Sequence, residues 1–193
     1  MTISLMKGQR ISLSKGGAIL SRIFMGLGWD VAQKSGFFGG LLRGNQEIDL
    51  DASCLVFDEA SHLVDEIWFR QLSGMNGAVV HTGDNMTGAG DGDDEVIKVD
   101  LTRLPGTIKS LVFTVNSFQG QTFDKVANAR CRVVDEISGR ELAIFNLSES
   151  GPHTGFIMAK LYRHNEEWKI HAIGERTNGR TFHDMMPAIQ AVL

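Results

Sequence analysis

The 193-residue sequence has only two cysteines, Cys54 and Cys131, and no excess of positive charge. Both cysteines lie in apolar, strand-like runs, and we expect them to be buried free thiols, which are the default in a reducing cytoplasm. The formal net charge is −4 at pH 7, so there is no electrostatic reason to expect binding to nucleic acid or to an anionic membrane.

Long apolar runs are also missing. None approaches the roughly 20 residues of a membrane span, and residues 1–5 lead into Lys7 and Arg10 rather than into the apolar core of a signal peptide. We therefore expect a cytoplasmic protein that does not insert into membranes. With 42% hydrophobic residues, the chain is long enough for one core and short for two, so we expect a single domain over residues 1–193.

Acidic side chains, in contrast, are concentrated in a glycine-rich stretch between Thr82 and Ile97 that contains no lysine or arginine. The carboxylates of this stretch, which we call the acidic loop, are Asp84, Asp91, Asp93, Asp94 and Glu95. Like charges in one short loop repel one another unless a cation lies among them. Because no nearby side chain can neutralise them, we expect a bound metal ion.

The ligands that the acidic loop offers are hard oxygen atoms: carboxylates, the Asn85 amide oxygen and the Thr87 hydroxyl. This set suits Ca²⁺ or Mg²⁺ and fits zinc poorly. The loop is not an EF-hand, because Met86 and Gly88 stand where oxygen ligands belong, and the nonapeptide of a parallel β-helix would need tandem copies. An acidic, solvated loop without metal is the alternative interpretation.

A second acidic element lies upstream, where Asp49 and Asp51 precede the apolar run 54–57. Side chains alternate along an extended segment, so these two carboxylates point to one face. Beside the acidic loop they would form a shared cage. Asp30, which follows Gly28 and Trp29, is a further candidate.

Segments spread in order over nearly the whole chain carry a common pattern: Gly26-Leu27-Gly28-Trp29-Asp30, Ile48-Asp49-Leu50-Asp51-Ala52-Ser53, His81-Thr82-Gly83-Asp84-Asn85-Met86-Thr87-Gly88, Gly90-Asp91-Gly92-Asp93-Asp94-Glu95 and Val99-Asp100-Leu101. Residues 112–118 and 131–135 fit the same pattern. Together these segments resemble the TerD-type family of tellurium-resistance and stress-response proteins, and most closely its TerZ-like members.

The resemblance implies a cytoplasmic bacterial β-sandwich that binds Ca²⁺, with two ions held by the acidic segments. It implies a role in resistance to tellurite and other chemical stress without catalysis, and association with other tellurium-resistance or stress proteins, including membrane-anchored ones. Calcium would order the acidic loops and create a surface that a partner recognises. Carried over position by position, the metal-site residues are Asp30, Asp49, Asp51, Asp84, Asn85, Asp91, Asp93, Asp94 and Glu95.

Two enzymatic interpretations stay open. Asp49 and Asp51 are spaced as in metal-dependent aspartyl-phosphate phosphatases, although those motifs follow a buried parallel strand and here the apolar run comes after. Cys131, flanked by Arg130 and Arg132, could instead act as a thiol-based tellurite reductant, although both arginines point away from it in a strand.

The histidines offer little for catalysis, because they show no i, i+4 pair and no cysteine partner at zinc spacing. His81 adjoins the acidic loop. We expect it to be an exposed residue at the end of a strand, and the alternative is that it donates a hydrogen bond to a ligating carboxylate.

Short alternating segments bounded by turn residues predict an all-β fold, a two-sheet antiparallel sandwich with few short helices. An echo in residues 3–16 predicts an N-terminal hairpin, and the best helix candidate is 181–192, with Pro187 in its first turn. The further strands are predicted at 23–29, 52–57, 64–69, 77–82, 96–99, 109–116, 129–134, 141–145, 155–162 and 168–173.

Overall fold

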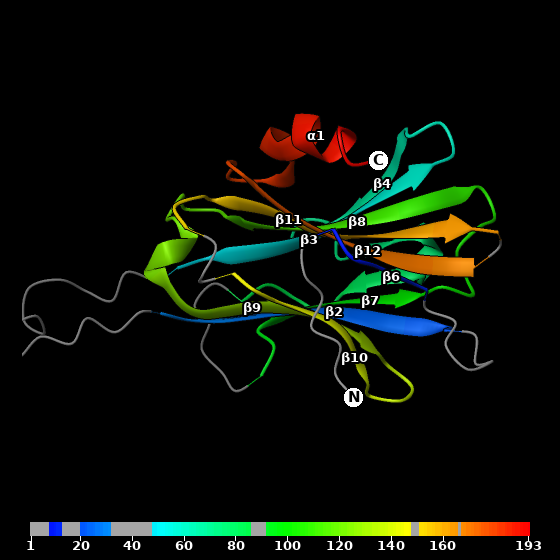
Figure 1. The fold of residues 1–193 in the computed structure, drawn as a ribbon, viewed down its shortest axis with the longest axis horizontal. Helices are drawn as coiled ribbons and strands as arrows, with labels where there is room; N and C mark the ends of the chain where they lie inside the picture. The colour runs from blue at the N-terminus through cyan, green and yellow to red at the C-terminus, as the bar shows by residue number, and fades with distance from the viewer. Residues whose placement is uncertain (1–7, 13–19, 32–47, 86–91, 148–150, 166) are drawn as a thin grey trace, which may run out of the picture.

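Two antiparallel sheets of six strands each pack face to face in the computed structural model of the chain (Figure 1). The structure describes residues 8–12, 20–31, 48–85, 92–147, 151–165 and 167–193. The first sheet has the strand order β1-β12-β11-β8-β3-β4, and the second has the order β10-β9-β2-β7-β6-β5. The predicted β-sandwich with a C-terminal helix is confirmed.

The strands of the first sheet are β1 (Arg10–Ser12), β3 (Leu50–Asp58), β4 (Leu63–Ile67), β8 (Ile108–Ser117), β11 (Gly155–His164) and β12 (Glu167–Thr177). Those of the second sheet are β2 (Arg22–Val31), β5 (Ser73–Gly74), β6 (Val79–His81), β7 (Glu95–Asp100), β9 (Val126–Asp135) and β10 (Glu141–Asn146). The helical elements are the 3-10 turns η2 (Met75–Gly77) and η3 (Phe123–Lys125) and the α-helix α1 (Phe182–Gln190).

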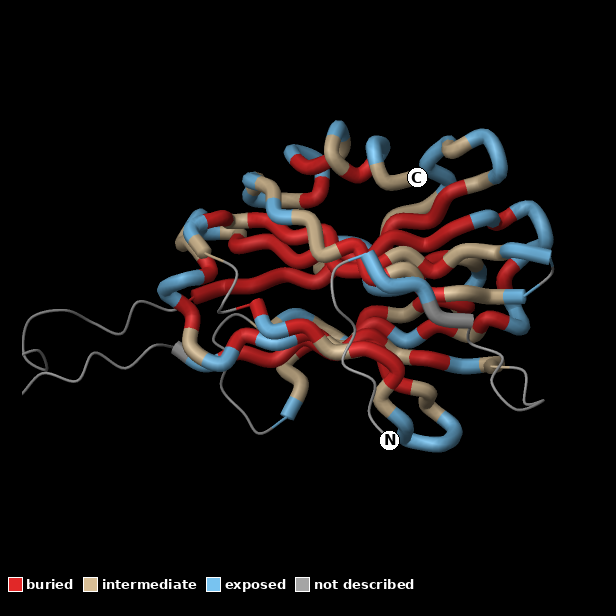
Figure 2. Tube along the Cα trace, in the orientation of Figure 1, coloured by how far each residue is buried: buried red, intermediate tan, exposed pale blue. Residues whose placement is uncertain are grey.

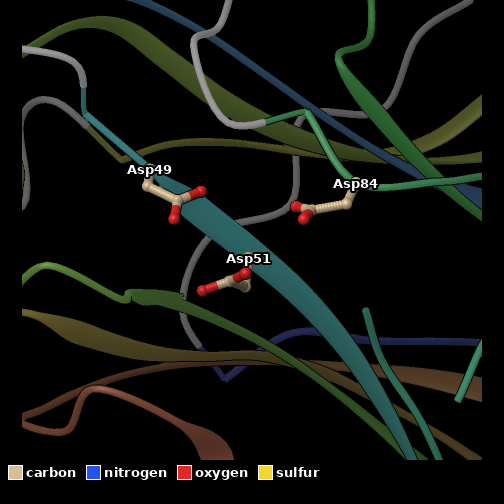
Figure 3. A group of neighbouring side chains, drawn as sticks. All are labelled: Asp49, Asp51 and Asp84. Atoms are coloured by element: carbon tan, nitrogen blue, oxygen red, sulfur yellow. The ribbon is translucent and has the colours of Figure 1, made fainter. Parts of the chain in front are cut away.

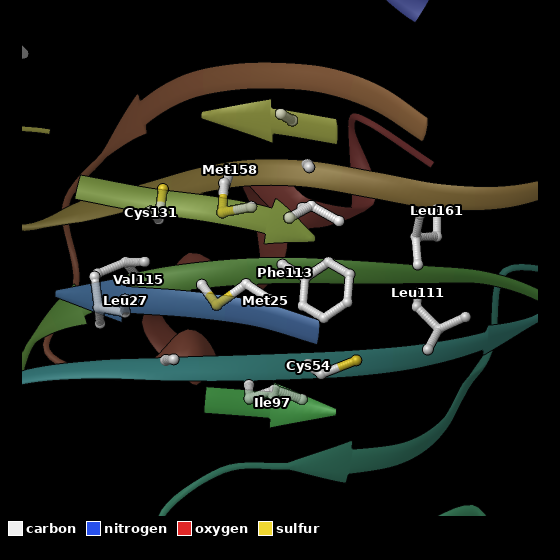
Figure 4. Close-up of a cluster of buried hydrophobic side chains, with 14 of the residues drawn as sticks. Met25, Leu27, Cys54, Ile97, Leu111, Phe113, Val115, Cys131, Met158 and Leu161 are labelled. Atoms are coloured by element: carbon white, nitrogen blue, oxygen red, sulfur yellow. The ribbon is translucent and has the colours of Figure 1, made fainter. Parts of the chain in front are cut away.

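The core lies between the two sheets and follows from the alternation of apolar residues along the strands. Met25 and Leu27 of β2 face Phe113 and Val115 of β8, and all four side chains are fully buried (Figure 4). Buried segments run through the middle of both layers, while the exposed segments lie at the turns and edges (Figure 2).

The outer face of the first sheet is covered in part by α1 (Figure 1). Phe182, Met185 and Ile189 are fully buried there, and this second apolar cluster also contains Leu55 of β3 and Val112 of β8. The helix therefore buries part of the first sheet on both faces, which is why β8 is buried along nearly its whole length.

α1 begins where the sequence predicts, but the position of Pro187 within it differs from the prediction. A capping box closes the N-terminus of the helix, in which Thr181 and Asp184 satisfy each other's backbone N–H groups. The expected position of Pro187 in the first turn is therefore wrong, because the cap starts the helix earlier and leaves Pro187 inside it.

The start of β6 and the N-terminal segment also differ from the predicted strands or lie partly outside the described residues. The strand predicted at 77–82 begins later, at Val79, because Met75–Gly77 form a 3-10 turn with positive φ at all three residues. The predicted N-terminal hairpin lies largely outside the described residues. The part that the structure describes, β1, pairs with β12.

The topology brings several strand ends to one end of the sandwich. The start of β3 lies beside the end of β8, since Asp51 pairs in register with Asn116. In the second sheet, the start of β7 lies beside β2, since Glu95 pairs with Leu27. Within the described residues, no helix is both long and apolar enough to cross a lipid bilayer.

Candidate metal centre

Three carboxylates meet where β3 begins (Figure 3). Ligand atoms of Asp49, Asp51 and Asp84 all lie within 4.8 Å of one another, and we call these residues the carboxylate triad. Asp49 and Asp51 are buried at the start of β3, whereas Asp84 is exposed and comes from the segment after β6. Each sheet thus contributes to one cluster of oxygen atoms.

The electrostatics of the triad are unfavourable without a cation. Burial raises the pKa of Asp49 to about 6, and the charges of Asp84 and Glu95 add to this shift. Burial and the neighbouring Asp49, Glu95 and Asp84 carboxylates raise the pKa of Asp51 to about 8, although a hydrogen bond from Asn116 opposes the rise. At neutral pH Asp51 therefore keeps a proton that a metal ion could replace.

Two buried acceptor atoms at this site have no hydrogen-bond donor among the described residues. The Asn116 amide donates to Asp51 Oδ2 over 2.9 Å and to the Arg180 carbonyl over 2.7 Å. Asp49 Oδ1 and Asn116 Oδ1 are buried and accept no hydrogen bond from any described residue. A buried acceptor without a partner is costly, and a hard cation is one way to satisfy it.

Glu95 holds the start of β3 against the second sheet. Its side chain is fully buried, and Oε2 accepts the Ala52 N–H over 2.8 Å. This N–H lies beyond the last residue pair of β3 with β4, which joins Cys54 to Ile67, so the carboxylate takes the place of a neighbouring strand. Glu95 Oε1 accepts the Asn85 N–H over 3.3 Å.

His81 lies behind Glu95 rather than at the surface. It is 2% exposed, so the expectation of an exposed strand end is wrong. The Gly83 N–H donates to Nδ1, which assigns the imidazole proton to Nε2, and Nε2 lies 3.3 Å from Glu95 Oε2. The imidazole thus faces a carboxylate of the acidic loop, although the geometry at Nε2 is not that of a hydrogen bond.

The expectation that no basic side chain neutralises the acidic loop is wrong for Asp93. Arg132 of β9 donates to both oxygens of Asp93 over 2.9–3.1 Å and also to Glu141 over 2.9 Å. Sequence spacing does not reveal this pair, because its partners lie 39 positions apart and meet only when β2 and β9 pair.

Two glycines of β2 let the acidic loop approach the strand. A Cβ atom on Gly28 would lie 2.6 Å from the Gly92 carbonyl oxygen, and one on Gly26 would overlap the Asp93 carboxylate. With no side chain in the way, the Asp94 N–H donates to the Leu27 carbonyl over 2.7 Å. The alternation of Gly26, Leu27 and Gly28 therefore puts glycine on the face of β2 that the loop crosses.

Asp30 and Asp94 line a separate cleft of about 450 Å³. Asp94 accepts hydrogen bonds from the Trp29 N–H and the Asn85 amide, and Asp30 accepts one from the Asn128 amide. Burial raises the pKa of Asp94, and the charge of Asp30 adds to the rise. The cleft also contains Gly28, Gly92, Arg130, Ile144, Phe145 and Asn146.

Comparison with known proteins places the chain in a family. The TerD domain matches residues 1–186 of the chain. The chain belongs to the TerD family. It is 53% identical over 183 residues to the tellurium resistance protein TerZ of Serratia marcescens, covering 95% of this chain and 94% of that protein.

Other TerD relatives agree. The chain is 44% identical over 195 residues to the stress response protein SCP2 of Bacillus subtilis (strain 168), covering 96% of this chain and 98% of that protein. The crystal structure of a homologue of telluride resistance protein (TerD) from Streptomyces coelicolor A3(2) has a TM-score of 0.70 at 22% identity, covering 83% of this chain and 92% of that one. The TerD sandwich is therefore the fold of this chain.

Within this TerD fold, the nine residues predicted at a metal site divide into groups. Asp49, Asp51 and Asp84 form the triad, with Glu95 and Asn85 hydrogen-bonded beside it. Asp30 and Asp94 lie in the cleft, Asp93 is held by Arg132, and Asp91 lies outside the described residues. Sequence reasoning missed Asn116, Asn128 and Arg132, which lie on strands and carry no acidic charge. Of these, Asn116 and Arg132 fall inside the family-like segments 112–118 and 131–135.

The structure gives little support to either of the two enzymatic interpretations, the thiol reductant and the aspartyl-phosphate phosphatase. Cys54 and Cys131 are both fully buried, and burial raises the pKa of each thiol far above neutrality. The thiolate that a reductant needs is therefore disfavoured at both positions. The strand pairs around Asp49 and Asp51 are antiparallel, so the parallel strand context of an aspartyl-phosphate phosphatase is missing from the described sheets.

Proposed function

We propose that this chain is a calcium-binding, non-catalytic protein of tellurite and chemical-stress resistance. The observation that carries the proposal is the carboxylate triad, whose pKa values are raised and which retains a buried acceptor, Asp49 Oδ1, without a hydrogen bond among the described residues. The relatives named for tellurium resistance and stress response support the biological setting.

The donor set favours calcium over other common metals. All triad ligands are carboxylate oxygens, and the Asn116 amide lies beside them. Calcium accepts such oxygen ligands in flexible geometry, magnesium demands a stricter octahedron, and zinc prefers nitrogen and sulfur. Asp49, Asp51 and Asp84 would hold the first ion. Asp30 and Asp94, in the cleft, are the residues best placed to hold a second.

Calcium would supply positive charge and rigidity, and the chain would supply the frame. Glu95 anchors the acidic loop to β3, and Arg132 anchors it to β9, so only part of the loop depends on the ion. Neutralising the triad removes the repulsion between the two sheets at this end of the sandwich. The ordered loop would then be the surface that other tellurium-resistance or stress proteins recognise.

Thermal unfolding tests this proposal. At a calcium concentration about one hundred times its Kd, binding adds about 2.7 kcal/mol, which corresponds to a rise in Tm of about 5–10 °C for a chain of this size. We expect Asp49→Asn with Asp84→Asn to abolish most of this rise.

The matched control is Glu59→Gln with Asp124→Asn, which removes the same charge from exposed positions outside the triad. It should keep the full calcium-dependent rise. If the triad variant responded to calcium as the control does, calcium would have to bind elsewhere.

A further inference from the structure

A row of basic side chains crosses the outer face of the first sheet. The register pairs Arg10 of β1 with His171 of β12, and His171 with Lys160 of β11. Directly opposed residues share a face, and strands lie about 4.8 Å apart, so these side chains form a line about 10 Å long. Lys169, two residues along β12, shares the face. We call these four residues the basic row.

The basic row points away from the core. Its neighbours along the strands, Ile170, Ala172 and Leu161, are buried between the two sheets, so the row lies on the opposite face. That is the face that α1 covers, because Lys160 pairs with Val112, which belongs to the cluster under the helix. The row and the helix therefore lie side by side on one surface.

Three residues of the basic row form no ion pair among the described residues, although Glu167 lies two residues before Lys169 on the same face of β12. Arg10 is exposed and the other three are half-buried, and no ion pair joins Arg10, Lys169 or His171 to an acid within the described part of the chain. Burial lowers the pKa of Lys160 and of His171, and the charge of Arg10 lowers both further. Arg10, Lys160 and Lys169 thus place like charges on one surface, although the net charge of the chain is −4 and the lowered pKa leaves His171 largely uncharged at neutral pH.

The chain's own C-terminal segment shows how this surface meets a peptide. Lys160 Nζ donates to the backbone oxygens of Val192 and Leu193 over 2.5 and 2.8 Å. These residues follow α1, and their contact with Lys160 of β11 places them on the outer face of the first sheet. Peptide oxygens therefore already lie against one cation of the row.

The shape of the surface selects among anionic partners. A helix packed on a sheet stands about 10 Å above it, which is the diameter of the helix. The basic row therefore lies at the foot of α1, in the step between the helix and the surface of the sheet. A flat bilayer or a rigid duplex would meet the helix before the row, whereas a single extended peptide fits beside it. Such a peptide carries every second side chain on one side at about 7 Å intervals, close to the separation of Lys169 and His171 along β12.

The basic row is also separate from the triad. Val112 lies between Lys160 and Leu55 of β3, and Leu55 is four residues, or about 13 Å, along β3 from Asp51. This separation exceeds the screening length of about 8 Å at physiological salt. The row can therefore attract an anion while the other end of the sandwich repels one.

We propose that the basic row, Arg10, Lys160, Lys169 and His171, is a docking surface for an extended acidic segment of a partner protein. The segment would lie in the step beside α1, with its carboxylates on the cations of the row. This contact is distinct from the calcium-ordered loop surface and does not need calcium.

Fluorescence anisotropy tests the docking surface directly. The probe is a short fluorescein-labelled peptide of alternating Glu and Ser, and a peptide of alternating Gln and Ser is the neutral comparison. We expect the acidic peptide to bind the whole chain, more weakly as salt is added and equally with calcium or EGTA. Arg10→Gln with Lys169→Gln should weaken this binding about tenfold, because the double variant loses two cations and the charge-assisted hydrogen bonds that they would donate.

The matched control is Lys125→Gln with Arg140→Gln, which removes two exposed cations from other parts of the surface and should leave the Kd within about twofold. Equal weakening in the two double variants would overturn the proposal, because net charge alone would then explain the binding. So would absence of binding at low salt. Tighter binding of phosphatidylserine vesicles or duplex DNA through Arg10 and Lys169 would overturn the assignment to a peptide.

Discussion

At the scale of single residues, the triad places carboxyl groups where burial and neighbouring carboxylates disfavour their ionised form. Asp51 is 3% exposed and lies among three other carboxylates. The Asn116 hydrogen bond offsets only part of this, so the folded chain without metal keeps protons on the triad that the unfolded chain would release.

The first prediction concerns pH. The folded pKa values of Asp49 and Asp51, about 6 and about 8, lie above their unfolded value of about 3.8, so the folded state binds more protons between these limits. The free energy of unfolding of the metal-free chain should therefore fall as pH rises from about 4 to about 8. Calcium replaces the protons, so the gap in Tm between calcium and EGTA should widen over the same range.

Thermal unfolding across this pH range, with calcium or with EGTA, measures both effects. Asp51→Asn serves as the comparison, because it removes the group with the higher pKa and should flatten the upper part of the profile. A gap in Tm that stays constant between about pH 5 and about pH 8 would contradict the linkage.

The second prediction concerns Glu95. Glu95→Ala leaves the buried Ala52 N–H without an acceptor, whereas Glu95→Gln keeps an acceptor oxygen and removes the charge equally. The free energy of unfolding of the alanine variant should lie about 2 kcal/mol below that of the glutamine variant. Urea denaturation measures the difference, and equal midpoints would show that Glu95 does not anchor β3.

At the scale of elements, the loop and β2 are matched surfaces. Gly26 and Gly28 remove the side chains that would hold the loop away, and Arg132 on the neighbouring β9 fixes Asp93. The glycines of β2 leave room for the loop, and the pairing of β2 with β9 brings the positive charge of Arg132 to Asp93.

A substitution at Gly28 tests this match. The Cβ atom of Gly28→Ala would lie 2.6 Å from the backbone oxygen of Gly92, so the loop must move, and we expect the free energy of unfolding to fall by about 1–3 kcal/mol. Gly106→Ala is the control, since nothing lies within 4 Å of its Cβ position. If chemical denaturation gave the two variants the same free energy of unfolding, the close approach of Gly92 to Gly28 would not contribute to stability.

Much of the element structure could be predicted because period-two alternation is local. The strands predicted at 109–116 and 155–162 lie inside β8 and β11, and the alternation of Asp49 and Asp51 placed both on one face. Non-local features could not be predicted. The 3-10 turn at Met75–Gly77 and the Arg132–Asp93 pair depend on packing between segments far apart in the chain, which no local pattern encodes.

At the scale of the whole molecule, the sandwich keeps its thiols in the core and the carboxylate triad at one end. Cys54 and Cys131 are fully buried between the sheets, where their pKa values are raised by burial. The whole fold thus argues for a role without thiol chemistry.

Bacterial tolerance to tellurite checks this argument. In cells that depend on this chain, Cys54→Ala with Cys131→Ala should leave tolerance unchanged at equal protein level, because neither thiol reaches solvent. Loss of tolerance with normal folding would instead support the reductant.

The central claim is that the triad end of the molecule binds calcium. The most direct measurement is calorimetric titration of the purified, metal-free chain with Ca²⁺, with Mg²⁺ and Zn²⁺ titrated in parallel. The account predicts saturable Ca²⁺ binding, with weaker Mg²⁺ binding and no preference for Zn²⁺. It also predicts that Asp49→Asn with Asp84→Asn removes at least one calcium site. A titration without saturable Ca²⁺ binding would contradict the account.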